Sequence, residues 1–395
     1  MTVELPPLPD DPLAAELDSF VDEHRLAQRY RELDRAPEFP RSEFLAMGRA
    51  GWLGLDRARE DGGRGISLPR AGRLVYRLAF RSGTTFAKLS LQPGFSSVLG
   101  DHGSRDLVTQ YYRPLVRGEI LIGTQLTEPE AGSDLRALST VAEPTSDGYL
   151  LTGSKSEIAF AQDASWAIVY ARVPTERSRD GLTALLVRQD QPGVRREVVP
   201  DLGEHWMRRG RVHYERVAVS SAFRIGEEGA ALRYLLPELD RERALLAMIY
   251  LGVARASWDE AVRRVGARRV FDRALADHEA VGFALVEDWA ELEATRLYAE
   301  RTLERLAQGE AVDQDAALSK VLATRVALRT IDHALQFSGG AGYSAELAHE
   351  QRWRDVRSGP IAHGSTELLL RTAARRIWRR PARDSDRTGP ADSSR

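Results

Sequence analysis

The sequence predicts a mostly helical protein with a central β domain, and three observations support this fold class. Apolar residues recur at helical spacing from about residue 12 to 120 and again from about 233 to 380. Between these regions, from about 122 to 225, apolar residues occur in short or alternating runs separated by turn signals such as Asp147-Gly148. With 395 residues, 43% of them hydrophobic, the chain is long enough for two or three domains.

Each region is expected to form one domain. Residues 1–121 should form a helical domain in which Gly-rich segments such as 60–67 separate the helices. Residues 122–232 should form a β-barrel-like domain, with strands near 149–152, 167–173, 182–187 and 212–219. Residues 233–380 should form a four-helix bundle, because two apolar stripes run along long helices: Val281, Leu285, Trp289, Leu292, Ala299, Leu303 and Leu306, then Leu318, Val321, Leu328, Ile331 and Leu335. Residues 381–395 lack apolar anchors and are expected to be a disordered tail.

The composition excludes several classes of function. Lysine plus arginine number 56 and aspartate plus glutamate 58, so the charge balance favours neither a nucleic-acid nor a membrane partner. Arginine heavily outnumbers lysine, which base composition alone can explain. The absence of cysteine excludes disulfides, thiolate metal ligands and cysteine nucleophiles, and no metal site is predicted. The N-terminus lacks a signal-peptide pattern and no apolar run is long enough to span a bilayer, so we expect a cytoplasmic protein.

Five motifs follow one another along the chain. They are LIGTQLTEPEAGSD at 121–134, LTGSKSEIAFA at 151–161, LDRERALLA at 239–247, ARRVFDRALADHE at 267–279, and the run from 336 to 367 that contains QFSGGAG, RWRD and AHGSTE. These motifs, in this order and with helices on either side of a β domain, resemble the acyl-CoA dehydrogenase superfamily. The resemblance covers almost the whole chain.

The resemblance implies FAD as the cofactor and assigns residues to it. Residues 124–133 would lie along the flavin ring, and the segment around Arg268 would reach the diphosphate and adenosine of a neighbouring subunit's FAD. The glycines of QFSGGAG independently suit this role, because glycine allows backbone amides to approach a diphosphate closely. The cofactor-binding residues implied are Thr124, Leu126, Thr127, Gly132, Ser133, Glu157, Ala159, Arg268, Phe271, Gln336, Gly339, Gly340, Ser365 and Glu367.

The chemistry implied is α,β-dehydrogenation of an acyl thioester, carried by CoA or by an acyl carrier protein. His363 stands where the family usually has the glutamate that removes the α-proton, although its backbone N–H can still polarise the thioester carbonyl. The first candidate for the base is Glu242, because its Leu-Asp-x-Glu-Arg motif resembles that of isovaleryl-CoA dehydrogenase; it could instead be a surface carboxylate paired with arginine. The second candidate is the imidazole of His363, which could instead only shape the pocket. Substrate-binding roles are implied for Ser133, Asp240, Arg243 and Gly364.

Other departures leave the reaction open. The family's Trp-Ile-Thr beside the flavin is Glu157-Ile158-Ala159 here, which removes a hydroxyl donor to the ring and places a carboxylate near it. These changes favour a specialised pathway over general β-oxidation. A flavin-dependent monooxygenase on the same fold is the alternative, and a binding or assembly protein without catalysis is a third reading. The expected partners are an electron acceptor, such as an electron-transfer flavoprotein or oxygen, and further copies of the chain in a homodimer or homotetramer.

Overall fold

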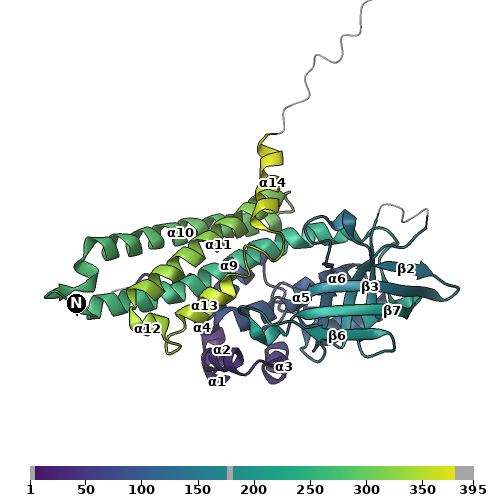
Figure 1. Ribbon diagram of the computed structural model, residues 1–395, viewed down its shortest axis with the longest axis horizontal. Helices are drawn as coiled ribbons and strands as arrows, with labels where there is room; N and C mark the ends of the chain where they lie inside the picture. The colour runs from purple at the N-terminus through teal and green to yellow at the C-terminus, as the bar shows by residue number, and fades with distance from the viewer. Residues whose placement is uncertain (1–4, 176–180, 379–395) are drawn as a thin grey trace, which may run out of the picture.

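The fold has the predicted class, with helices at both ends of the chain and a β domain between them (Figure 1). The structure is a computed structural model that describes residues 5–175 and 181–378. The predicted disordered tail, residues 381–395, lies outside the described residues. Within the described part of the chain, no helix is long and apolar enough to cross a membrane.

The N-terminal helices precede the β domain, and α1 and α2 pack against the long helix α4. They are α1 (Ala14–Glu23), α2 (Leu26–Arg35), α3 (Arg41–Arg49), α4 (Leu68–Ser90), α5 (Gln92–Phe95), α6 (Ser97–His102), α7 (Arg105–Leu107) and α8 (Arg113–Val116). Helix α4 follows Ser67, which has an extended backbone, and its first turn contains Pro69. The helical geometry of α4 is interrupted at Gly83, whose φ is 71°, and an added Cβ there would clash with the ring of Tyr30.

The β domain consists of two four-stranded sheets. Strands β1 (Ile122–Gln125), β4 (Trp166–Ala171), β5 (Thr183–Arg188) and β8 (Arg224–Ile225) form one sheet, in the order β1-β4-β5-β8. Strands β2 (Val141–Pro144), β3 (Gly148–Ile158), β7 (Gly210–Ser220) and β6 (Val194–Val198) form the other, in the order β2-β3-β7-β6. In β4, Ala167 and Val169 face the second sheet while Ile168 and Tyr170 join the helical core, so this strand is buried on both faces.

The C-terminal helices form the bundle. They are α9 (Ala231–Ala267), α10 (Glu279–Ala307), α11 (Asp313–Phe337), α12 (Gly340–Tyr343), α13 (His349–Val356) and α14 (Thr366–Ile377); the short strands β9 (Arg269–Val270) and β10 (Arg273–Ala274) follow α9. Residues 244–254 of α9 are buried around the whole helix, because α4, α10 and α11 all pack against it. An added Cβ at Gly252 would lie 2.3 Å from the carbonyl oxygen of Tyr76, so glycine allows α4 to approach α9 closely.

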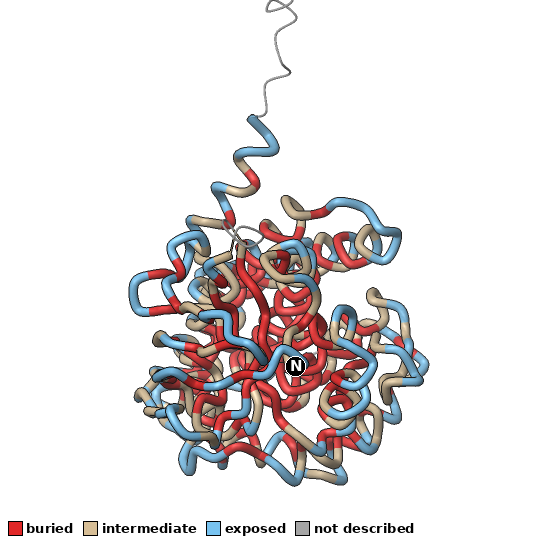
Figure 2. Tube along the Cα trace, turned by 90° about the vertical axis from the view of Figure 1, so that its right-hand side faces the viewer, coloured by how far each residue is buried: buried red, intermediate tan, exposed pale blue. Residues whose placement is uncertain are grey.

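The buried residues follow the long helices through the molecule, and α14 projects beyond them (Figure 2). A buried polar network joins all three regions near the C-terminal end of α4. The ammonium of Lys88 pairs with the carboxylate of Glu204 at 2.5 Å. Asp355 accepts hydrogen bonds from the hydroxyls of Tyr30 (2.7 Å) and Thr84 (2.9 Å) and from the backbone N–H of Glu204 (2.7 Å). This network fixes the position of α13 and of the turn that follows it.

Candidate active site

The turn between α13 and α14 carries His363 in an uncommon backbone conformation. His363 has a φ of 55° and Gly364 a φ of 98°, and both values lie in the left-handed region that favours glycine. Ser365 then ends the turn, since its hydroxyl accepts a hydrogen bond from the N–H of Leu368 and caps α14. A histidine with positive φ is strained, so neighbouring groups must hold the turn in place.

Two cationic side chains bind three successive carbonyl groups of this turn. The ammonium of Lys320, from α11, donates to the carbonyl oxygens of Ala362 and Gly364, the latter at 2.6 Å. The guanidinium of Arg243, from α9, donates to the carbonyl oxygen of His363 at 3.0 Å and to Asp240 at 2.7 Å. Among the described residues, none accepts a hydrogen bond from the backbone N–H of His363. The turn therefore offers one donor that its own fold does not use.

Glu242 lies beside this turn on α9. It is 5% exposed, and its Oε2 is 3.5 Å from Nε2 of His363. Burial, reinforced by the carboxylate of Glu238 one helical turn earlier, raises the pKa of Glu242 to about 8. The interpretation of Glu242 as a surface carboxylate is therefore wrong: the side chain is buried, and burial holds its pKa well above the usual value of a glutamate.

The imidazole of His363 is uncharged at neutral pH. Burial lowers its pKa to about 3, and the cationic groups of Lys320, Lys88 and Arg243 act in the same direction. Its side chain is 29% exposed. The ring packs against Phe95 with centroids 5.3 Å apart, and its Nδ1 is buried without a hydrogen-bond partner among the described residues. Below a pH of about 8, Glu242 and His363 therefore form an uncharged pair of neighbouring side chains.

The predicted flavin-ring residues lie on β1 and the loop after it. Thr124 already donates its hydroxyl to the carbonyl oxygen of Phe95 at 2.9 Å. Leu126 and Thr127 follow, while Gly132 and Ser133 are exposed on the loop. The buried Glu128 organises this loop, since it accepts hydrogen bonds from the N–H groups of Ser139 (2.6 Å) and Thr140 (3.0 Å) and from the ammonium of Lys155 (2.9 Å).

Glu157 and Ala159 lie at the end of β3. Glu157 has a φ of 59°, and its carboxylate pairs with Arg209 at 2.5 Å. This partner compensates the acidic charge that the sequence placed near the flavin. Ala159 has no hydrogen-bonding side chain, as the sequence indicated.

The predicted diphosphate residues meet in one pocket of about 480 Å³. Arg268, Gln336, Gly339 and Gly340 all line it, although the chain separates the first from the others by 68 residues or more. Arg264 lines it too and was not identified from the sequence. Within the described chain, neither arginine has a carboxylate within ion-pair distance, and an added Cβ at Gly339 or Gly340 would meet no atom within 4 Å.

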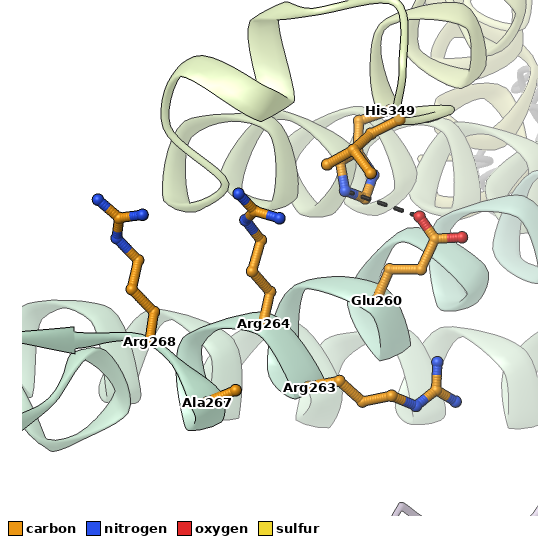
Figure 3. Close-up of a pocket in the computed structure, with 7 residues that line it drawn as sticks. Glu260, Arg263, Arg264, Ala267, Arg268 and His349 are labelled. Carbon is orange, nitrogen blue, oxygen red and sulfur yellow. Dashed lines mark ion pairs between the residues drawn. The ribbon is translucent and has the colours of Figure 1, made fainter.

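A second pocket, of about 550 Å³, shares both of these arginines (Figure 3). Arg263 and the buried His349 also line it, and His349 approaches Glu260 at 3.8 Å. Figure 3 shows the guanidinium groups of Arg264 and Arg268 projecting to the same side of α9. Two unpaired guanidinium groups beside open glycine backbone suit a diphosphate.

The remaining predicted residues lie at the edges of these sites. Phe271 is outside both pockets and 88% exposed, on the turn between β9 and β10. Ser365 is the cap of α14, and Glu367 is exposed in the first turn of that helix. Asp240 and Arg243 pair with each other beside Gly364, whose added Cβ would lie 3.4 Å from the Arg243 guanidinium.

Lys320, like Arg264, is a residue at these sites that sequence reasoning missed. Lys88, Lys155 and Lys320 are the three lysines among 56 lysine and arginine residues, and all three are buried. Lysine is rarely buried, and in an arginine-rich chain each remaining lysine marks a position where a compact ammonium is needed. This scarcity was visible in the sequence and could have identified the position.

Comparison with known proteins gives matches along most of the chain. Three family models match: the N-terminal domain of acyl-CoA dehydrogenase over residues 11–119, the middle domain over 123–217 and the C-terminal domain over 231–378. A 3-(aryl)acrylate reductase of Clostridium sporogenes is 30% identical over 342 residues, covering 85% of this chain and 90% of that protein. A benzylmalonyl-CoA dehydrogenase of Aromatoleum aromaticum is 29% identical over 366 residues, covering 91% and 95%.

Solved structures show the same fold. The crystal structure of an acyl-CoA dehydrogenase from Geobacillus kaustophilus superposes with a TM-score of 0.87 at 24% identity, covering 92% of this chain and 97% of that one.

Proposed function

The chain belongs to the acyl-CoA dehydrogenase superfamily, and from that premise we propose that it catalyses α,β-dehydrogenation of an acyl thioester in a specialised pathway. It is an oxidoreductase whose cofactor is FAD. The observation that carries the proposal is the buried Glu242 carboxyl group 3.5 Å from His363, beside a turn whose N–H has no partner in the described chain. A proton acceptor and a carbonyl-binding donor therefore lie together.

The residues present fit FAD. Arg264 and Arg268 would hold the diphosphate of a neighbouring copy's FAD together with the backbone at Gly339 and Gly340, and the loop that Glu128 organises would lie along the ring of the chain's own FAD. Bound FAD would accept a hydride from the β-carbon of the substrate. Apolar side chains are also exposed on this protein, at Phe271 and on α14, which projects from the bundle.

Glu242 is our choice for the base. Its raised pKa means that the carboxylate, once formed, has a strong affinity for a proton, which suits a group that removes a weakly acidic α-proton. The neutral His363 lies 3.5 Å from this carboxyl group and adds no charge to the pair. Because His363 binds protons so weakly, it is the poorer base of the two.

The turn supplies the second element of catalysis. Removal of the α-proton places negative charge on the thioester oxygen, and a fixed hydrogen-bond donor at that position lowers the barrier. The backbone N–H of His363 is suited to this role whatever the side chain at position 363. Asp240, Arg243, Gly364 and Ser133 would line the path of the carrier arm, as the resemblance implies.

We infer an oligomer built through the FAD end of the bundle, a homodimer or a tetramer of dimers. Large apolar side chains exposed there include Phe271, Phe283 and Val286, and on α14 Ile377 and Trp378. Exposed apolar patches of this kind mark interaction surfaces. The electrons would leave to an acceptor such as an electron-transfer flavoprotein or oxygen, and the carrier would be CoA or an acyl carrier protein.

Anaerobic mixing with a panel of acyl thioesters tests the proposal. Bleaching of the oxidised flavin by at least one thioester, without any other reductant, is the expected result. Ala159 and His363 favour a flavin-dependent monooxygenase as the second candidate, because neither retains the side chain that the family uses for dehydrogenation. Reduction by an external reductase alone, with oxygen uptake that depends on the thioester, would support that candidate instead.

A further inference from the structure

Lys320 differs from the other two buried lysines in its partners. Lys88 pairs with Glu204 and Lys155 with Glu128, as buried ammonium groups usually require. Lys320 is 1% exposed and, among the described residues, has no carboxylate within ion-pair distance. Its partners are the carbonyl oxygens of Ala362 and Gly364. Burial, with Arg243 and Lys88 nearby, lowers the pKa of Lys320 to about 7. The buried amine of Lys320 therefore donates hydrogen bonds to the turn and forms no ion pair within the described chain.

The contacts of Lys320 fix the direction of a peptide group. In a planar trans peptide the C=O and the following N–H point in opposite directions. Lys320 holds the carbonyl of Ala362, so the N–H of His363 points away from α11. Arg243 holds the next carbonyl on its own side, from α9. His363 has an unfavourable φ of 55°, so the turn should change its conformation if these donors are removed.

We propose that Lys320 is a positioning residue, which aims the backbone N–H of His363 at the thioester oxygen of the substrate. The inference rests on the proposed function, because it names what holds the oxyanion donor of that reaction. Hydrogen bonds weaken steeply when the donor is misaligned, so rotation of this one peptide reduces stabilisation of the developing charge. A lysine that only stabilised the fold would leave that stabilisation unchanged.

The ionisation of a bound enolisable thioester distinguishes a lysine that positions the N–H of His363 from a lysine that only stabilises the fold. Acetoacetyl-CoA is added to the FAD-loaded enzyme, and the long-wavelength absorption of its enolate against the oxidised flavin is titrated with pH. Lys320→Met should move the midpoint upward by about one pH unit, a tenfold loss of enolate stabilisation, with unchanged FAD content. Ser319→Ala is the matched control, because this buried neighbour on α11 bonds Thr302 and not the turn. Its midpoint should equal that of the unmodified protein.

A second variant covers a loss of folding or of FAD in Lys320→Met. Arg243→Gln removes the donor to the His363 carbonyl and should move the midpoint in the same direction. A Lys320→Met midpoint equal to that of the unmodified protein would overturn the inference and leave the proposed function intact. If Lys320→Met does not fold, the Arg243→Gln midpoint decides. An unchanged Arg243→Gln midpoint would show that loss of a donor to this turn does not affect the enolate, and it would overturn the inference. If the unmodified protein gives no enolate band at any pH, the thioester site itself is wrong and the inference falls with it.

Discussion

Replacing Glu242 by glutamine tests which group removes the α-proton. The pH dependence of flavin reduction distinguishes Glu242 from His363, because the two groups have different pKa values. With a pKa of about 8, Glu242 is ionised in roughly one molecule in a hundred at pH 6 and in about one in ten at pH 7. The rate constant should therefore rise about tenfold per pH unit below pH 8 and reach a plateau above it. If His363 were the base, it would already be neutral throughout this range, and the rate would not change.

The assay is anaerobic rapid mixing with a reducing thioester, followed through the loss of oxidised-flavin absorbance. Glu242→Gln should lower the plateau rate at least ~100-fold, as expected for loss of a positioned base, and should remove the pH dependence. His363→Ala should have a smaller effect, because the backbone N–H remains. A pH-independent rate in the unmodified protein, or near-normal reduction in Glu242→Gln, would refute the reasoning and transfer the role to the imidazole.

Glu238→Gln is the control for this experiment. The Glu238 carboxylate raises the pKa of Glu242, so its removal should move the inflection to lower pH while the plateau rate stays close to that of the unmodified protein. An inflection that moves to higher pH would show that another group titrates. Since Glu242 and His363 are in contact, the inflection belongs to the pair and not to either residue alone.

Three further outcomes are expected. Arg264→Gln and Arg268→Gln should each speed release of FAD from the purified enzyme about tenfold or more, measured by flavin fluorescence, whereas Arg263→Gln, which lines only the neighbouring pocket, should not. Phe271→Asp should convert the proposed oligomer to smaller species in light scattering, because it places a charge on an apolar side chain that is 88% exposed. Glu128→Gln should lower the free energy of unfolding by about 3 kcal/mol in denaturant titration, because it leaves the buried Lys155 ammonium without its counter-charge.

The fold class and the diphosphate residues could be predicted because they depend on local patterns. The β domain follows from short apolar runs, and Arg268 and QFSGGAG lie within motifs that keep their order along the chain. Their meeting in one pocket adds Arg264, which no motif marked. Its contribution depends on α9 ending beside α12, and the sequence does not show which helix ends are neighbours.

The environment of Glu242 could not be predicted for a similar reason. The segment Asp240 to Arg243 contains four charged residues in succession, which usually indicates a solvated helix face. In the structure Arg241 and Glu242 are both buried, and Arg241 donates to Asp56 at 2.8 Å, a residue 185 positions away. Asp56, from the segment between α3 and α4, supplies the counter-charge for the buried Arg241. Burial in turn raises the pKa of Glu242.

The histidine at position 363 and the glutamate at position 242 are two parts of one arrangement. A glutamate at 363 would bring a second carboxylate close to the first, and two carboxylates in one buried site cannot both ionise readily. The higher of the two carboxyl pKa values would rise further, so that this carboxyl group would stay protonated at neutral pH and could not act as a base. A neutral imidazole avoids this competition, since it lies beside Glu242 without adding negative charge. We therefore interpret the loss of the family glutamate from the turn as the condition under which a base on α9 can work, with the backbone of the turn keeping its role as donor.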